Sequence, residues 1–264
     1  MNFSWTGRDH LYIDEPAVFS IGPVAAGIFG GSSKAGQYKN EDGCLIYIGE
    51  DWELGMILDA HKSAESAELA VREFSKAEQE VRAILTMPAG TALKELPLFL
   101  ADFFTHPDFL AACREVEGET ACLIAVRKDK YLFWFSIGDC VLHLYHPELA
   151  ALGEYQQNHR SFYEWVGQVN TFELPVPCIS TGVKELRKGS NHIFLATDGL
   201  LECPELPYNK PEAIFKEFQN RTIEDGMRIL LQQAHDFHIR DSCTHLSWIA
   251  DISEEGSMPS DLIK

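Results

Sequence analysis

The sequence predicts an α+β fold in which two stacked antiparallel β-sheets are flanked by helices, an α/β/β/α sandwich. Short apolar runs bounded by Gly or acidic turns, which are typical of strands, occupy the first, middle and last parts of the chain. Helical spacing of apolar residues is confined to two blocks between these strands. The 264 residues, 45% hydrophobic, suffice for one sizeable core or two small ones, and neither a repeat nor a linker divides them. We therefore expect one domain over residues 1–264, with a frayed tail at 253–264.

The elements follow one another in alternating blocks of strands and helices. The first strands give way to helical periodicity over 63–85 and 93–116, and Pro97 and Pro107 interrupt the second of these stretches. A polar and aromatic stretch at 146–174 has neither period and is expected to be irregular. Strands are expected at 18–29, 44–49, 53–61, 119–129, 131–140, 141–145, near 179, at 192–199 and at 244–252, and the later helices at 211–218 and 223–237.

Charge and cysteine content exclude several classes of protein. The formal net charge is -18 and the pI about 4.9, so nucleic acid and anionic membrane surfaces are poor candidate partners. The seven cysteines are scattered, odd in number and form no CxxC pair, which indicates neither a zinc knuckle nor a disulfide framework. The first ten residues lack the apolar region of a signal peptide, and no run is apolar enough to span a bilayer. A reducing cytoplasm is the expected compartment.

Acidic residues recur where apolar strands meet turns. A carboxylate there is half desolvated, which is costly unless a cation or donor compensates it. Each acid alone is typical of a turn or helix cap, but several at one sheet edge would suit Mg²⁺ or Mn²⁺. The acids in this position are Glu41, Asp42, Asp59, Asp139, Asp198 and Asp241.

Six segments, in order, resemble the motifs of the metal-dependent Ser/Thr protein phosphatases of the PP2C or PPM type. GQYKNEDG resembles the R-x-x-x-E-D opening, LDAHKSAESAEL resembles D-G-H-G-G-x-x-A-A, and GETACLIAV resembles G-S-T-A. SIGDC resembles G-D-S-R, LATDGLLE resembles S-D-G-L-W-D, and RDSCTHLSWI resembles D-N-x-T. The resemblance covers about residues 29–252 and indicates a divergent, bacterial-like member with this family's two-sheet sandwich.

The resemblance implies a centre of two Mg²⁺ or Mn²⁺ ions and a third, weaker ion. Asp59 would bridge two metals, and Asp198 and Asp241 would complete the shell of one. Glu41 would hold the second metal, mostly through water, with Asp42 in support. The remaining implied ligands are the backbone carbonyl of Ala60 and, for the third ion, Asp139.

The resemblance also implies the reaction and its partners. A hydroxide that bridges the metals would attack phosphoserine or phosphothreonine of a protein substrate directly. His61 matches the residue that protonates the leaving oxygen, a role that suits histidine as a residue type. Alone, it would more often be a helix-entry histidine, and its place beside Asp59 makes the two interpretations about equal. The implied setting is signalling, by a monomer that acts opposite a Ser/Thr kinase.

Departures from the family pattern leave alternatives open. The phosphate-binding arginine falls at Gln37, a neutral and weaker donor, so Lys34, Lys39 or Arg160 would have to substitute. Three motif neighbours also change, at Ala60–Lys62, Cys140–Val141 and Ser242. A pseudophosphatase that binds a partner through the flap-like segment 155–166, and a phosphatase for small phosphorylated metabolites, are the rival hypotheses.

Overall fold

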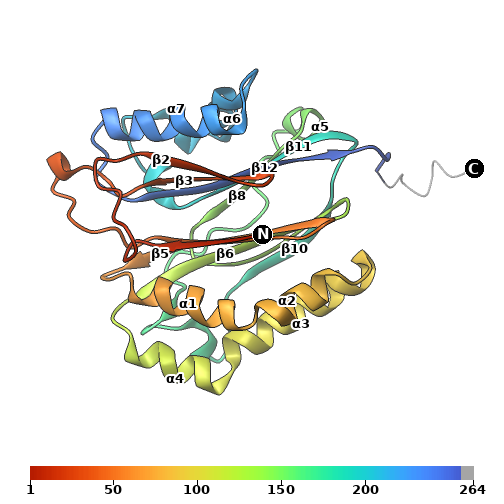
Figure 1. Ribbon diagram of the computed structural model, residues 1–264, viewed down its shortest axis with the longest axis horizontal. Helices are drawn as coiled ribbons and strands as arrows, with labels where there is room; N and C mark the ends of the chain where they lie inside the picture. The colour runs from red at the N-terminus through yellow and green to blue at the C-terminus, as the bar shows by residue number, and fades with distance from the viewer. Residues whose placement is uncertain (257–264) are drawn as a thin grey trace, which may run out of the picture.

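The computed structural model describes residues 1–256. Two antiparallel sheets stack face to face, with helices on both outer faces (Figure 1). The expected α/β/β/α sandwich is therefore confirmed. Of the expected tail at 253–264, residues 257–264 lie outside the described part of the chain.

Within the described residues the larger sheet has seven strands and the smaller sheet has five, and all recorded pairings are antiparallel. In order across the larger sheet lie β1 (Asn2–Thr6), β4 (Gly43–Ile48), β5 (Trp52–His61), β6 (Glu119–Lys128), β7 (Tyr131–Ile137) and β10 (Ser180–Glu185), and β9 (Val166–Gly167) pairs with β6. The smaller sheet has the order β2 (Ala17–Ile21), β3 (Val24–Phe29), β12 (Cys243–Ile252), β11 (Gly189–Ala196) and β8 (Val141–Tyr145).

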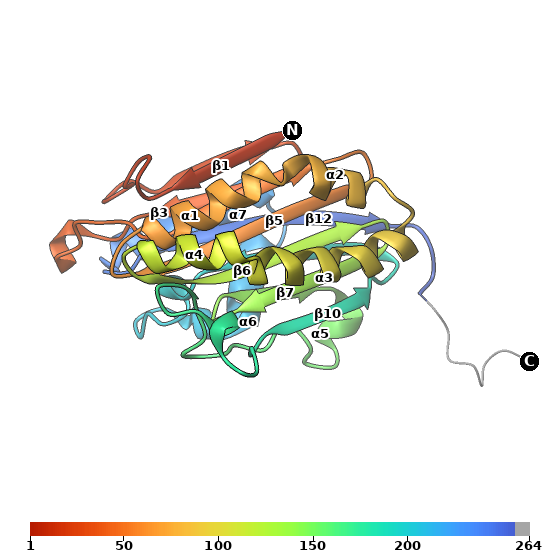
Figure 2. The same cartoon turned by 90° about the horizontal axis from the view of Figure 1, so that it is seen from below.

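Helices cover the outer face of each sheet. Helices α1 to α4 pack below the larger sheet, and helices α6 and α7 pack above the smaller one (Figures 1 and 2). Each described helix is too short or too polar to cross a membrane. The lower helices are α1 (Glu65–Lys76), α2 (Glu78–Leu85), α3 (Ala89–Thr105) and α4 (Pro107–Glu115), the upper ones are α6 (Pro211–Phe218) and α7 (Ile223–Asp236), and α5 (Pro147–Ala150) is a single turn.

The alternation of side chains along β5 decides which face each residue supplies. Ile57 packs between the two sheets, whereas Leu58 packs against the helices below. Because successive side chains of a strand point to opposite faces, Asp59 faces the space between the sheets. The core between the sheets thus ends in a carboxylate at this strand terminus.

Several expected elements differ in detail. The strand expected at 18–29 is the hairpin β2–β3, and the helix expected at 63–85 is the pair α1 and α2. Pro97 lies inside α3 instead of breaking it. Leu96, Leu100 and Phe104 form a buried stripe on this helix, and their burial outweighs the roughly 3 kcal/mol that an interior proline costs. Strand β1 was not expected from the sequence.

Candidate metal centre

The strand ends that carry the acids meet at one end of the sandwich. Gly43, which follows Asp42, pairs with Leu58 next to Asp59, and Asp59 pairs with Ala121. In the smaller sheet Ala196 pairs with His245, so the end of β11 lies beside the start of β12. The antiparallel registers thus gather acids that are up to 199 positions apart in the sequence, Asp42 and Asp241.

Among residues 1–256, Asp59, Asp139 and Asp198 form a group of carboxylates close enough to share a metal ion. One oxygen from each lies within 4.8 Å of the others. Asp59 is 7% exposed and Asp139 is 5% exposed, and Asp59 Oδ2 and Asp139 Oδ1 have no hydrogen-bond partner. Buried carboxylate oxygens without donors are costly, and a bound cation would satisfy them. The residues present therefore fit a divalent metal with oxygen ligands.

Burial raises the pKa values of this group of acids and of the neighbouring Asp241. Burial and then the charge of Asp198 raise the pKa of Asp59 well above its ordinary value. Burial, followed by the charge of Asp241, raises the pKa of Asp198 to about 6. Burial also raises the pKa of Asp241, although the Ser242 N–H donates to Asp241 Oδ1 at 2.9 Å. A pocket of mutually repelling carboxylates favours either protons or cations.

Asp42 is buried close to this group and is held by threonines that the sequence analysis did not single out. Thr197 Oγ1 donates to Asp42 Oδ2 at 3.1 Å and accepts the Thr244 N–H at 2.9 Å. Burial raises the pKa of Asp42 well above its ordinary value, and hydrogen bonds from Thr244 and Thr197 oppose that rise. Their sequence signal was the position of each hydroxyl at a strand end beside a candidate acid.

Two glycines bring the acid-bearing turns into contact. A Cβ on Gly199 would lie 2.0 Å from the Ser242 carbonyl oxygen, so only glycine lets the turn after Asp198 approach the turn that carries Asp241. Gly138 has φ +87°, and a Cβ there would lie 2.5 Å from the Cβ of Ala121. Each of these glycines directly adjoins a candidate ligand.

The segment after Asp59 carries the candidate carbonyl ligand, Ala60, and the candidate proton donor, His61. Ala60 is the penultimate residue of β5 and pairs with Thr120, so extended backbone accommodates its Cβ. His61 is exposed and its ring centroid lies 4.6 Å from that of Trp165. The imidazole is near enough to Asp139 and Asp241 to lower their pKa values, against the larger effect of burial. His61 thus lies at the rim of the acidic group.

Glu41 has a different partner from the other acids. Lys39 Nζ donates to Glu41 Oε1 at 2.7 Å and to the carbonyl oxygen of Lys62 at 3.1 Å. Glu41 is outside the group of three carboxylates within 4.8 Å. The structure therefore brings Lys39 to the edge of the site, bound to a candidate ligand.

Two further candidate phosphate-binding residues, Gln37 and Arg160, are arranged differently. Gln37 is 9% exposed, and its Oε1 accepts the N–H of Tyr38, so this side chain turns back on its own loop. Arg160 Nε donates to the Asp139 carbonyl at 2.7 Å, and its Nη2 donates to Glu202 at 2.8 Å. Of the two, Arg160 is the one held against an acid-bearing turn, and its partner Glu202 was missed by the sequence analysis.

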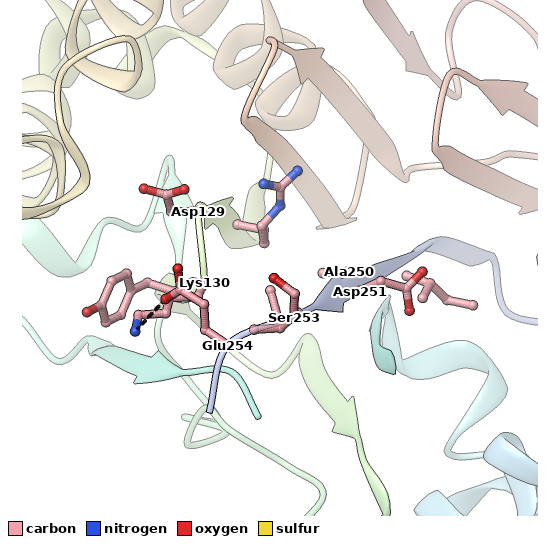
Figure 3. Close-up of a pocket in the computed structure, with 10 residues that line it drawn as sticks. Asp129, Lys130, Ala250, Asp251, Ser253 and Glu254 are labelled. Atoms are coloured by element: carbon pink, nitrogen blue, oxygen red, sulfur yellow. Dashed lines mark ion pairs between the residues drawn. The ribbon is translucent and has the colours of Figure 1, made fainter. Parts of the chain in front are cut away.

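A cavity of about 390 Å³ lies elsewhere, between the β6–β7 turn and the end of β12 (Figure 3). Lys130 lies there between Glu185 and Glu254, at 3.1 and 3.2 Å. None of the candidate acids lines this cavity. It belongs to the opposite end of the sandwich, because β6 and β12 run away from the metal centre.

Comparison with known proteins places the fold among bacterial phosphatases. A bacterial serine phosphatase with an arginine-to-glutamate substitution aligns at a TM-score of 0.67 and 20% identity over 88% of this chain and 100% of that chain. Stp1, a serine/threonine phosphatase from Staphylococcus aureus, aligns at 0.58 and 16% identity over 96% of this chain and 94% of its own. The catalytic domain of the serine/threonine protein phosphatase PstP, in complex with 2 manganese ions, aligns at 0.56 and 16% identity over 86% and 98%.

No protein-family model matches the sequence, and no curated protein matches it. The structural likenesses are below 25% identity and show the fold. The chain therefore has the two-sheet sandwich fold of bacterial serine/threonine phosphatases, as the sequence resemblance implies.

Proposed function

We propose that this chain is a metal-dependent phosphatase that hydrolyses phosphoserine and phosphothreonine in proteins. The observation that carries the proposal is the group formed by Asp59, Asp139 and Asp198, whose buried oxygens include two without hydrogen-bond partners. The shared fold of phosphatases, one of them complexed with manganese, supports the same assignment.

In this proposal Mg²⁺ or Mn²⁺ is bound by the acidic end of the sandwich. Two such ions would supply charge neutralisation and an activated water when bound. The carboxylates that would hold the pair of ions are those of Asp59, Asp198, Asp241 and Glu41, with Asp42 in support. Asp139 would hold a third, weaker ion, and Ala60 would contribute its backbone carbonyl.

The chain's own residues orient the substrate and move one proton. His61, at the rim, donates a proton to the leaving seryl or threonyl oxygen. Arg160 and Lys39 bind phosphate oxygens in place of an arginine, and the Gln37 amide is a weaker contributor. Because Lys39 contacts Glu41 and Arg160 contacts the Asp139 carbonyl, both cations adjoin candidate ligands on different loops.

The proposal extends to the setting of the protein. We propose a monomer made of one domain over residues 1–264 that acts in the cytoplasm on proteins phosphorylated by a Ser/Thr kinase. The net charge of -18 suits such a setting and disfavours nucleic acid and membrane surfaces as partners.

The test is release of phosphate from a phosphothreonine peptide with Mn²⁺, and then with a chelator. Wild type should release phosphate only with metal, Asp198→Asn should release none, and Asp251→Asn, an exposed change near the other end of β12, should behave as wild type. Bound metal without turnover of any substrate would contradict the proposal and indicate a non-catalytic binding module. Faster turnover of sugar phosphates than of the peptide would indicate a metabolite phosphatase.

A further inference from the structure

A groove of about 270 Å³ opens directly beside the candidate metal centre. It lies between the turn after β1, the loop before β4 and the turn that leads into α1. Its lining includes Glu41, a proposed metal ligand, and Lys62, which directly follows His61. The residues that matter for its chemistry are Arg8, Leu11, Lys39, Glu41, Lys62 and Glu65.

The groove is rich in cations for so acidic a chain. Three cations line it, in a molecule with 22 Lys and Arg against 40 Asp and Glu. The two acids that line it are engaged, because Glu65 Oε2 accepts the Glu117 N–H at 2.8 Å and Glu41 holds Lys39 at 2.7 Å. Glu68 and Glu117, the ion-pair partners of Arg8 and Lys62, adjoin the groove, so its charges nearly balance in a chain whose net charge is -18. An anionic group is therefore repelled less here than over most of the remaining surface.

Arg8 is the cation with most capacity to accept a new partner. Its Nη1 donates to Glu68 at 2.7 Å, and its side chain is 63% exposed. A guanidinium has five N–H donors, and an exposed ion pair contributes little, so a second carboxylate could share it. Lys39 is already bound by two oxygen acceptors, and Lys62 Nζ lies 3.3 Å from Glu117.

Apolar surface accompanies the charges. Leu11 is 44% exposed and Ala64 is partly exposed on the groove. An extended peptide that leaves the metal centre would present one side chain to Leu11 and another to Arg8. Leu11 is held in place through its carbonyl oxygen, which accepts the Asn40 side-chain N–H at 3.0 Å.

We propose that this groove binds the polypeptide that flanks the phosphorylated residue, and that it selects an acidic side chain there. The inference rests on the proposed phosphatase function and names its substrate class as acidic phosphopeptides. Arg8 is the specificity-determining residue, and it lies outside the group of acids that would hold metal.

The test compares two phosphothreonine peptides of equal length, one with flanking Glu and one with Gln at the same positions. Wild type should turn over the Glu peptide with a several-fold higher kcat/KM. Arg8→Gln should lower that kcat/KM about three- to tenfold through KM, the size expected for one charge-assisted contact at a surface. Arg8→Lys should keep part of the preference. Hydrolysis of p-nitrophenyl phosphate should not change, because a small aryl phosphate does not reach the groove.

The matched control is Arg228→Gln on α7, on the opposite outer face. Arg228 is 60% exposed and pairs with Asp225, much as Arg8 pairs with Glu68. Equal kcat/KM for the two peptides, with normal aryl phosphate turnover, would contradict the proposed selection of acidic peptides by the groove. The proposed phosphatase function would remain intact. Fluorescence anisotropy of both labelled peptides tests whether the groove binds the Glu peptide, even if no phosphate is released. Weaker binding of the Glu peptide to Arg8→Gln supports it, and unchanged binding refutes it.

Discussion

Lys62 has a backbone conformation that side chains other than glycine rarely adopt, with φ of 76°. The motif D-G-H-G has glycine at this position, where the absence of a Cβ removes the steric penalty. In this chain the Lys39 ammonium donates to the Lys62 carbonyl at 3.1 Å and helps to hold the turn. The motif's other glycine is replaced by Ala60 in extended strand, where a Cβ fits. The replacement of glycine by Lys62 therefore strains the backbone, whereas the replacement of glycine by Ala60 does not.

Lys62→Gly should leave the free energy of unfolding unchanged or raise it by up to about 1 kcal/mol, because relief of left-handed strain offsets the entropy of glycine in the unfolded chain. Lys94→Gly, in the interior of α3, should lower it by about 1 kcal/mol. Urea denaturation of the two variants measures both values. A larger loss for Lys62→Gly than for Lys94→Gly would show that the left-handed backbone costs nothing here.

Asp198→Asn should stabilise the metal-free protein at neutral pH although it removes turnover. Raising the pKa from 3.8 to about 6 corresponds to roughly 3 kcal/mol for keeping that carboxylate charged, an upper limit for the gain. Urea denaturation with chelator at neutral pH measures the change, and Asp251→Asn supplies the exposed control. If Asp198→Asn destabilises the chelated protein, repulsion within the acidic group is not the dominant local cost.

At the scale of elements, the segment between β8 and β10 is fixed to the site by a few side chains. Asn158 is 4% exposed, donates to Ser136 Oγ at 3.0 Å and the Cys140 carbonyl at 2.8 Å, and accepts the Leu142 N–H at 2.8 Å. These bonds span the turn that carries Asp139. An irregular segment can therefore support a precise site without regular secondary structure.

Asn158→Ala should lower the free energy of unfolding by about 2 kcal/mol, because it leaves several buried donors and acceptors unpaired. It should also lower kcat, since the turn around Asp139 loses its support. Denaturation and phosphate release measure the two effects, and Asn209→Ala, at an exposed position, is the control. Normal turnover in a destabilised variant would limit Asn158 to a structural role.

The same elements show how much could be predicted from the sequence. The bounds of α6 were predicted as observed, since Pro211 and the apolar spacing mark them locally. Pro97 was misread because tertiary burial of Leu100 and Phe104 is invisible to local rules. Strand β1 was missed because its pairing with β4 is long-range. Propensity identifies an element, whereas packing partners decide its extent.

The site, like the elements, could be predicted from the sequence only where the signal is local. Acids at strand ends were visible as a pattern, and the structure brings Asp59, Asp139 and Asp198 together. The hydroxyl support from Thr197 and the Arg160–Glu202 pair depend on contacts between distant segments, so the sequence could not show them.

For the molecule as a whole, the acidic end of the sandwich couples metal binding, protons and stability. Folding buries carboxylates whose pKa is raised, so it favours their protonated form. The stabilisation from each such group is complete below its unfolded pKa, near 3.8, and is lost as the pH rises through the folded pKa, about 6 for Asp198. In metal-free protein these acids therefore contribute less stability at neutral pH than at mildly acidic pH. Divalent cations that bind only the folded chain reverse this loss.

Saturating Mn²⁺ should therefore raise the Tm more at about pH 7.5 than at about pH 5.5, because protons compete for the same carboxylates at the lower pH. Differential scanning calorimetry of wild type with Mn²⁺ or chelator at both pH values measures the difference. Asp198→Asn should show a smaller Mn²⁺ shift that depends less on pH, since one ligand and one competing proton are gone. Asp251→Asn, with its exposed carboxyl group, should reproduce the wild-type pattern. Equal Mn²⁺ shifts at the two pH values would mean that the cation binds away from the buried acids. The buried acids at the strand ends would then not be the groups through which Mn²⁺ stabilises the folded sandwich.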